Sequence, residues 1–248
     1  MAPSARRSSD KKVMEDALRQ STGFAEWPAL AMNRLLASSD LVRHTRGDRV
    51  SPPPPAPSEI LMIVEGYVLH SEGQSDTGRR LSLILRGPGD VLGFTHVLRP
   101  KGRVLEYYAK SDALVIHTPG KTVFDLLDEE PTRWKDVSHM LMRQERVAID
   151  MAYGQMVGNL EQRVGVTLNQ LAAHYGARDE EGRLHLRVTQ QDLADILRIS
   201  RQSVNGVLKS WTAAGAIELK YNTIVVLDPQ VLSRPPDGAE AQERTITP

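Results

Sequence analysis

The sequence has 248 residues, a formal net charge of zero at pH 7 and no cysteine. This length is typical of two domains, and zero net charge excludes a global positive field that would draw the whole chain onto nucleic acid. The absence of cysteine excludes disulfides, thiolate-held iron–sulfur clusters and thiol redox sensing. No apolar run is long enough to span a bilayer and no signal-peptide core is present. We therefore expect a cytoplasmic protein without a membrane partner.

The N-terminal segment, residues 1–20, begins with Ser, Ala, Arg and Pro and predicts a disordered arm, although residues 13–19 could begin a helix. Residues 27–36 are a clearer helix candidate. After Asp40, short alternating segments are separated by glycine-containing turns, of which residues 87–90 (Gly-Pro-Gly-Asp) are the strongest. Many short strands at regular spacing predict an antiparallel barrel or roll, which we place in a sensor domain over residues 21–130.

A long helix is predicted over residues 131–158, because Pro131 suits a first helical turn and apolar residues recur at helical spacing. The apolar stripe fits either a core or a contact between two copies of the chain. Polar residues within such a stripe can fix the register of helical dimers. The stripe comprises Val137, Met140, Leu141, Val147, Ala148, Met151 and Ala152, and Gln144 and Gln155 interrupt it.

Two short helices are predicted within residues 188–212. Apolar residues at i, i+3, i+4 or i+7 give each helix one buried face. Thr189 can cap the first helix, and residues 198–200 form a tight turn before the second. This spacing fits a helix-turn-helix and an ordinary helical hairpin about equally well. The buried positions are Leu193, Ile196 and Leu197 in the first helix and Val204, Val207, Leu208 and Trp211 in the second.

The segment after the second helix favours the helix-turn-helix. Gly215 suits a left-handed helix end, and residues 217–220 and 223–227 read as two strands joined at Tyr221-Asn222. A hairpin in this position is a wing, which completes a predicted DNA-binding domain over residues 159–228. The polar segment 229–248 predicts a disordered tail.

These motifs resemble the catabolite activator protein and FNR (CRP/FNR) family of bacterial transcription regulators. The resemblance rests on Thr189-Gln190-Gln191-Asp192-Leu193-Ala194, on Ser200-Arg201-Gln202-Ser203-Val204, and on Gly215-Ala216-Ile217 with Thr223-Ile224-Val225-Val226. The turn glycines of the first half, among them Gly66, Gly89 and Gly93, are similar to those of the family's cyclic-nucleotide-binding roll. Together the two parts cover about residues 40–228. The resemblance implies an α+β fold with an antiparallel β-roll, a long dimerisation helix and a winged helix-turn-helix. It also implies a homodimer that binds double-stranded DNA and RNA polymerase.

In helix-turn-helix proteins the N-terminal residues of the second helix face base edges. Arg201, Gln202 and Asn205 are therefore the predicted base readers, with Ser203 and Lys209 nearer phosphates. Thr189, Gln190 and Ser200 complete the predicted DNA contacts. Residues 183–221 contain six Arg or Lys and three Asp or Glu, a local excess of three positive charges, although such runs are often simply solvated.

The predicted effector pocket departs from the family pattern. Cyclic-AMP binders of the family place a glutamate after the second pocket glycine and an arginine–serine pair further on. Here Phe94 follows Gly93, and Val104 follows Arg103, which could equally be an exposed strand residue that binds no ligand. Each lost hydrogen bond to a buried ligand group costs about 1–3 kcal/mol. The resemblance thus places a pocket at Gly93, Phe94, Arg103, Val104 and Ala148 but predicts no response to cyclic AMP.

Other functional classes are less well supported by the sequence. The seven histidines are scattered, and no nucleophilic triad, metal-ligand spacing or phosphate loop is present, so no enzyme and no cofactor is predicted. A sensor or scaffold of the same fold that has lost specific DNA binding is the alternative. The sequence does not identify an effector, an operator, the target genes or the direction of regulation.

Overall fold

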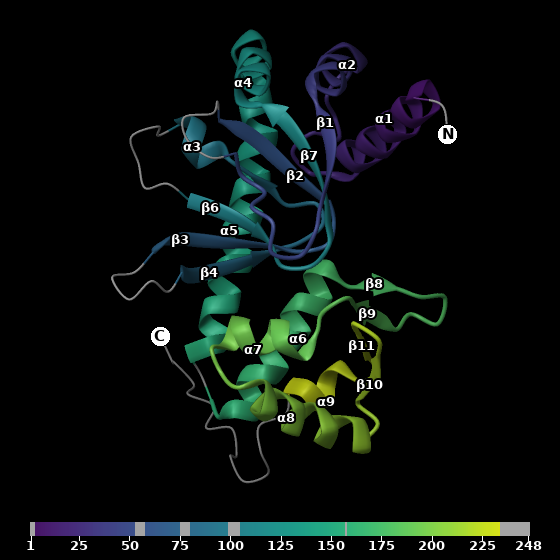
Figure 1. Ribbon diagram of the computed structural model, residues 1–248, viewed down its shortest axis with the longest axis vertical. Helices are drawn as coiled ribbons and strands as arrows, with labels where there is room; N and C mark the ends of the chain where they lie inside the picture. The colour runs from purple at the N-terminus through teal and green to yellow at the C-terminus, as the bar shows by residue number, and fades with distance from the viewer. Residues whose placement is uncertain (1–2, 53–57, 75–79, 99–104, 157, 234–248) are drawn as a thin grey trace, which may run out of the picture. The chain divides into compact units, whose positions relative to one another are not determined.

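The computed structural model describes residues 3–52, 58–74, 80–98, 105–156 and 158–233. It divides into two compact units, Met1–Ala148 and Ile149–Pro248, and each unit is described below by itself. In the first unit, strands form two sheets bordered by helices (Figure 1). In the second, short helices pack with a small sheet. None of the described helices is long and apolar enough to cross a membrane.

Helix α1 (Pro3–Gln20) occupies the segment for which the sequence predicted a disordered arm, and that prediction is wrong for residues 3–20. Met14 and Leu18, one helical turn apart, are buried in a cluster with Phe24 and Trp27. Polar composition at the start of the segment hid this apolar pair, which provides the tertiary packing that a helix needs in water. Helix α2 (Ala29–Ser38) confirms the helix predicted nearby.

The predicted antiparallel roll is confirmed. Its two sheets have the strand orders β1-β7-β2-β5 and β4-β3-β6, and every pairing recorded for them is antiparallel. The strands of the first sheet are β1 (Asp40–His44), β2 (Glu59–Glu65), β5 (Val91–Leu92) and β7 (Ala113–Pro119). Those of the second are β3 (Val68–Gln74), β4 (Arg80–Arg86) and β6 (Leu105–Ala109).

Two apolar clusters stabilise this unit because alternate residues of a strand face opposite sides of its sheet. An inner cluster, including Leu61, Ile63, Val68 and Val115, lies between the two sheets. An outer cluster packs the other face of β2 and β7 against helices. The remaining helices of this part are α3 (Phe94–Leu98), α4 (Gly120–Glu129), a 3-10 turn (Pro131–Arg133) and α5 (Trp134–Met156).

Helix α5 confirms the predicted long helix. Four residues of its apolar stripe are buried, whereas Leu141 and Ala148 are half-buried and Ala152 is exposed. Val137, Met140, Val147 and Met151 are at most 6% exposed and pack within the chain. Gln144, expected to interrupt a dimer contact, is also buried. With its amide oriented to satisfy both groups, it donates to the Val91 carbonyl at 3.0 Å and accepts from the Val91 N–H at 2.7 Å. The side chain of Gln155 lies outside the described residues. The large apolar side chains that α5 exposes are Met142, Ile149, Tyr153 and Met156.

The second unit contains a four-stranded antiparallel sheet, in the order β10-β11-β9-β8, and four further helices. The predicted wing is strands β10 (Ile217–Lys220) and β11 (Thr223–Val226). The wing sheet is extended by two strands that were not predicted, β8 (Ala177–Arg178) and β9 (Leu184–Leu186). The helices are α6 (Leu160–Tyr175), α7 (Gln190–Leu197), α8 (Arg201–Ala213) and α9 (Pro229–Ser233).

Helix α9 corrects the first part of the predicted disordered tail. Leu232 is 2% exposed, and the Asn169 amide of α6 donates to the Pro229 carbonyl at 3.1 Å. A Cβ at Gly165 would lie 2.0 Å from the Leu232 carbonyl oxygen, so only glycine permits this approach of α9 to α6. Residues 234–248 of the predicted tail lie outside the described residues.

Candidate DNA-binding site

Helix α7 begins at a complete capping box. The Thr189 hydroxyl accepts from the Asp192 N–H at 3.1 Å, and the Asp192 carboxylate accepts from the Thr189 N–H at 2.9 Å. These bonds satisfy two backbone donors that a helix start otherwise leaves without partners. Leu193, Ala194 and Leu197 are buried on the inner face. The predicted first helix and its cap are therefore confirmed.

The turn between α7 and α8 is fixed by backbone geometry. Arg198 ends α7 in the left-handed conformation at φ 55°, and the Ile199 N–H donates to the Ala194 carbonyl at 3.0 Å. From α6, the Arg163 guanidinium donates to the Leu197 carbonyl at 3.0 Å, which satisfies an acceptor at the helix end. The direction in which α8 leaves the turn is thus determined by local hydrogen bonds.

Helix α8 has one buried face and one exposed face. Val204, Leu208 and Trp211 lie at i, i+4 and i+7 and are at most 3% exposed. The Trp211 indole N–H donates to the Glu161 carboxylate of α6 at 3.0 Å, which anchors α8 in the unit. On the outer side, Arg201, Gln202, Gly206 and Lys209 are exposed, and Asn205 is half-buried. We call these five residues the outer stripe of α8.

Four further residues predicted to contact DNA lie near the outer stripe, at the starts of α7 and α8. They are Thr189, Gln190, Ser200 and Ser203. Ser200 caps α8 by accepting from the Ser203 N–H at 3.0 Å, and the two hydroxyls lie 2.7 Å apart. Thr189 uses its hydroxyl in the capping box, and Gln190 is the first residue of α7. A cap leaves a hydroxyl with further hydrogen-bonding capacity, so these roles do not exclude phosphate contact.

Some of the basic residues predicted around the motif form ion pairs with carboxylates, and others do not. Arg183 pairs with Asp179 at 2.7 Å and also with Glu181, and Lys220 lies 3.4 Å from Glu218. Burial opposes ionisation of Asp179, but hydrogen bonds from His185 and Arg183 outweigh it and hold the pKa of that carboxyl well below its usual value. In the part of the chain that the structure describes, no carboxylate pairs with Arg201 or Lys209. The positive charge of the outer stripe therefore remains available.

The predicted basic segment begins at Arg183, so it leaves out the carboxylates of Asp179 and Glu181 that pair with this arginine.

The wing carries one further feature that only the structure shows. Tyr221 at its tip is 92% exposed, beside Asn222 in the left-handed conformation at φ 51°. A positive φ at this position is typical of the tight turns that join hairpin strands.

Comparison with known proteins agrees with this geometry. Residues 162–234 match the family model of the Crp-like helix-turn-helix domain. A "CRP-like cAMP-activated global transcriptional regulator" of Mycobacterium tuberculosis strain H37Rv is 23% identical over 177 residues, which cover 71% of this chain and 78% of the relative. The chain therefore carries a Crp-like helix-turn-helix domain and is similar to regulators of the CRP/FNR family. The matched domain is a helix-turn-helix, and the matched relative is a transcription regulator.

Solved structures of the CRP/FNR family share the fold. A CRP-family transcriptional regulator from Thermus thermophilus has a TM-score of 0.59 at 23% identity, covering 77% of this chain and 94% of that one. FixK2 from Bradyrhizobium japonicum has a TM-score of 0.63 at 18% identity, covering 78% of this chain and 95% of that one.

Of the residues predicted for an effector pocket, the structure describes Gly93, Phe94 and Ala148. Phe94 is 4% exposed and lies in the outer cluster, with its ring centroid 6.0 Å from that of Phe124 on α4. Gly93 has φ 100°, and a Cβ there would lie 2.1 Å from the Glu59 carbonyl oxygen, so its role is structural. Ala148 is half-buried on α5. Arg103 and Val104 lie outside the described residues.

Between the sheets, the structure shows a polar group that sequence reasoning missed. The Tyr107 ring lies 5.2 Å from that of His70, its partner on the neighbouring strand, and 5.8 Å from that of His96 on α3. Burial raises the pKa of the Tyr107 phenol, against the opposing effects of a Gly93 backbone hydrogen bond and the Arg86 charge. The strand register brings Tyr107 and His70 together, and no local sequence pattern carries that information.

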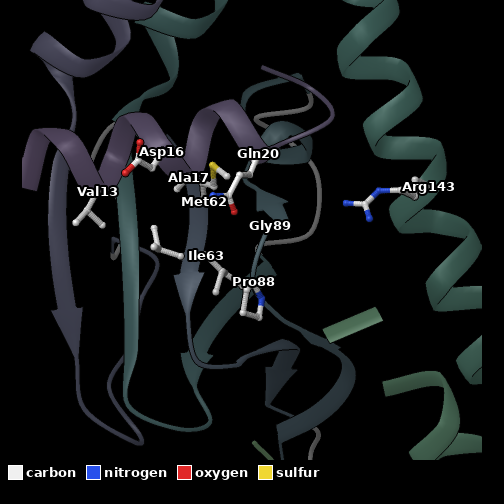
Figure 2. A pocket seen from close by; sticks show the side chains of 10 residues that line it. Val13, Asp16, Ala17, Gln20, Met62, Ile63, Pro88, Gly89 and Arg143 are labelled. Carbon is white, nitrogen blue, oxygen red and sulfur yellow. The ribbon is translucent and has the colours of Figure 1, made fainter. Parts of the chain in front are cut away.

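A separate hollow of about 390 Å³ opens on the first unit. Figure 2 shows side chains of α1 on one side of it and the Arg143 guanidinium extending toward it from α5. Among the residues that the structure describes, none of those predicted for DNA or effector binding lines this hollow. Its lining is Val13, Asp16, Ala17, Gln20, Met62, Ile63, Val64, Pro88, Gly89 and Arg143.

Proposed function

We propose that this regulator acts as a homodimer that recognises a palindromic promoter site through the outer stripe of α8 and does not respond to cyclic AMP. The observation that carries the proposal is the pair of faces on α8. Its apolar face is buried, while Arg201, Gln202 and Asn205 lie at the capped N-terminal end on the other side. Arg suits guanine O6 and N7, and Gln or Asn suits adenine N6 and N7.

The direct test is a gel-shift selection on genomic fragments with the full chain, followed by footprinting of the bound sites. Sequence-specific binding with footprints about 34 Å apart, one helical turn, supports the proposal. Salt-sensitive binding without sequence preference would instead favour the sensor or scaffold alternative, since phosphate contacts alone carry no sequence information. A contact with RNA polymerase remains a prediction from the family.

Two-fold binding requires a surface between the copies. Ile149, Tyr153 and Met156 lie at i, i+4 and i+7 of α5 and are 44%, 65% and 82% exposed. Such spacing gives a continuous apolar seam that a second copy of the same helix can cover. We propose this seam in place of the stripe predicted from the sequence, because Val137, Met140, Val147 and Met151 of that stripe are buried within the chain.

We expect Tyr153→Glu to convert the dimer to a monomer at micromolar concentration, because a charge in an apolar seam is desolvated without a partner. Light scattering during gel filtration measures the change. Leu30→Glu is the matched control, since Leu30 is an equally apolar residue, 74% exposed on α2, outside the seam. A wild-type chain that is monomeric both with and without DNA would contradict the dimer.

We expect no specific binding of cyclic AMP or cyclic GMP. The position that holds a ribose-binding glutamate in cyclic-AMP binders of the family is Phe94, whose side chain is in the outer core. Losing several buried hydrogen bonds, at about 1–3 kcal/mol each, removes micromolar affinity. Calorimetry on the full chain tests this, with the cAMP-activated relative of M. tuberculosis as the positive control. Low-micromolar binding of cyclic AMP would overturn this part of the proposal.

A further inference from the structure

Two histidines and a glutamate from three strands meet on one face of the first sheet. His117 on β7 lies opposite Asp40 on β1 and Leu61 on β2. His44 is four residues from Asp40 and Glu59 is two from Leu61, so the even spacing puts all three side chains on the same face. His44 is 9% exposed, and the side chains of His117 and Glu59 are 13% and 29% exposed. We call His44, His117 and Glu59 the histidine pair and its carboxylate.

The hydrogen bonds determine which ring nitrogens face each other. His117 Nδ1 lies 2.7 Å from the Glu59 carboxylate. An ionised carboxylate accepts hydrogen bonds but cannot donate them, so Nδ1 carries the proton. His117 Nε2 then bears a lone pair in the neutral ring. That nitrogen lies 3.0 Å from Nε2 of His44, and the two rings are stacked at 29° with centroids 5.2 Å apart.

We propose that the histidine pair binds a late first-row divalent metal ion, zinc(II) or copper(II), through the two Nε2 atoms. Imidazole nitrogen suits these ions, with metal–nitrogen distances of about 2.0–2.1 Å. Two such bonds at a tetrahedral angle separate the nitrogens by about 3.3 Å, so the present 3.0 Å spacing needs to widen by only a few tenths of an ångström. The site is distinct from the DNA-binding surface and does not depend on the proposed function.

The surroundings of the pair fit a ligand role. A carboxylate on the far ring nitrogen is the arrangement that orients metal-binding histidines and raises their basicity. Among the described residues, no three His, Asp or Glu side chains are placed to hold one ion. Water therefore completes the coordination, and a bound ion would bridge β1 and β7.

The competing interpretation is a plain hydrogen-bonded chain, in which His44 donates to His117 and His117 donates to Glu59. Both interpretations require the same geometry, so metal titration must separate them. We would titrate untagged, chelator-treated full-length protein with ZnCl2 by calorimetry and with CuCl2 by electron paramagnetic resonance. The matched control is His185→Gln, because His185 also contacts a carboxylate at 2.7 Å (Asp179) but has no second imidazole beside it.

We expect one equivalent of each ion, a copper spectrum with two nitrogen ligands, and at least tenfold weaker binding in His44→Gln and in His117→Gln. Glutamine retains hydrogen-bonding groups, and circular dichroism verifies that each variant folds. Glu59→Gln keeps both ligands and should weaken binding 10–100-fold through the lost orientation alone. His185→Gln should bind as the wild type. No binding, a single-nitrogen copper spectrum, or equal affinity in the wild type and both ligand variants would establish the hydrogen-bonded chain and overturn the proposal.

Discussion

Arg201→Ala is expected to abolish most of the preference for cognate over random DNA. Arg201 is the first residue of α8, exposed beside the Ser200 cap and without an ion pair in the described part of the chain. A bidentate contact from arginine to guanine is worth about 1–3 kcal/mol of discrimination. In a dimer the loss occurs in each half-site, so the cognate affinity should fall by about 2–6 kcal/mol in total. Competition gel shifts with cognate and random duplexes measure it.

Lys209→Ala is the matched control, because it removes one positive charge from the same stripe. Lys209 lies two helical turns beyond Arg201, where phosphates are expected. Its loss should weaken binding to cognate and random DNA equally and flatten the dependence of affinity on salt. An Arg201→Ala protein that kept the wild-type preference for cognate DNA would show that α8 is not the reading helix.

The DNA-binding unit was well predicted because its signals are local. Spacing of Leu193, Leu197, Val204, Leu208 and Trp211 identifies two amphipathic helices without knowledge of the rest of the chain. Caps are equally local, since a hydroxyl and an acceptor three residues apart satisfy one another. The structure confirms both helices, the Thr189 cap and the wing hairpin.

Periodicity could not determine which molecule covers an apolar face. On α5 the central residues of the predicted stripe are buried within the chain, whereas Ile149, Tyr153 and Met156, which also recur at helical spacing, are exposed. In α1, the burial of Met14 and Leu18 stabilises a helix in a segment of largely polar composition. Burial depends on tertiary contacts, which override local propensity in both cases.

Side chains that meet across neighbouring strands could not be predicted from the sequence, for a related reason. His44 and Glu59 lie 73 and 58 residues from His117 in the chain, and only the strand register joins them. Tyr107 and His70 meet in the same way. One residue of register slip would move any of these side chains to the opposite face of its sheet.

Trp211→Ala is expected to unfold the second unit locally and abolish DNA binding. Trp211 is 3% exposed, and its indole N–H donates to Glu161 of α6 at 3.0 Å. Truncating a buried tryptophan costs about 3–5 kcal/mol, a large share of the stability of a small domain. Tyr221→Ala is the control, because the loss of a 92% exposed aromatic ring should change stability by less than about 0.5 kcal/mol.

Amide hydrogen exchange on the full chain separates this effect from global unfolding. In Trp211→Ala, the amides of α6 and α8 should exchange faster by the factor that the lost free energy implies, while those of β2 and β7 in the first unit keep their protection. Trp211→Phe retains most of the apolar ring and loses the indole donor, so it should lie between the wild type and the alanine variant. Unchanged protection of α6 and α8 in Trp211→Ala would mean that Trp211 does not hold the reading helix in place, because the contact to Glu161 would then carry no measurable share of its stability.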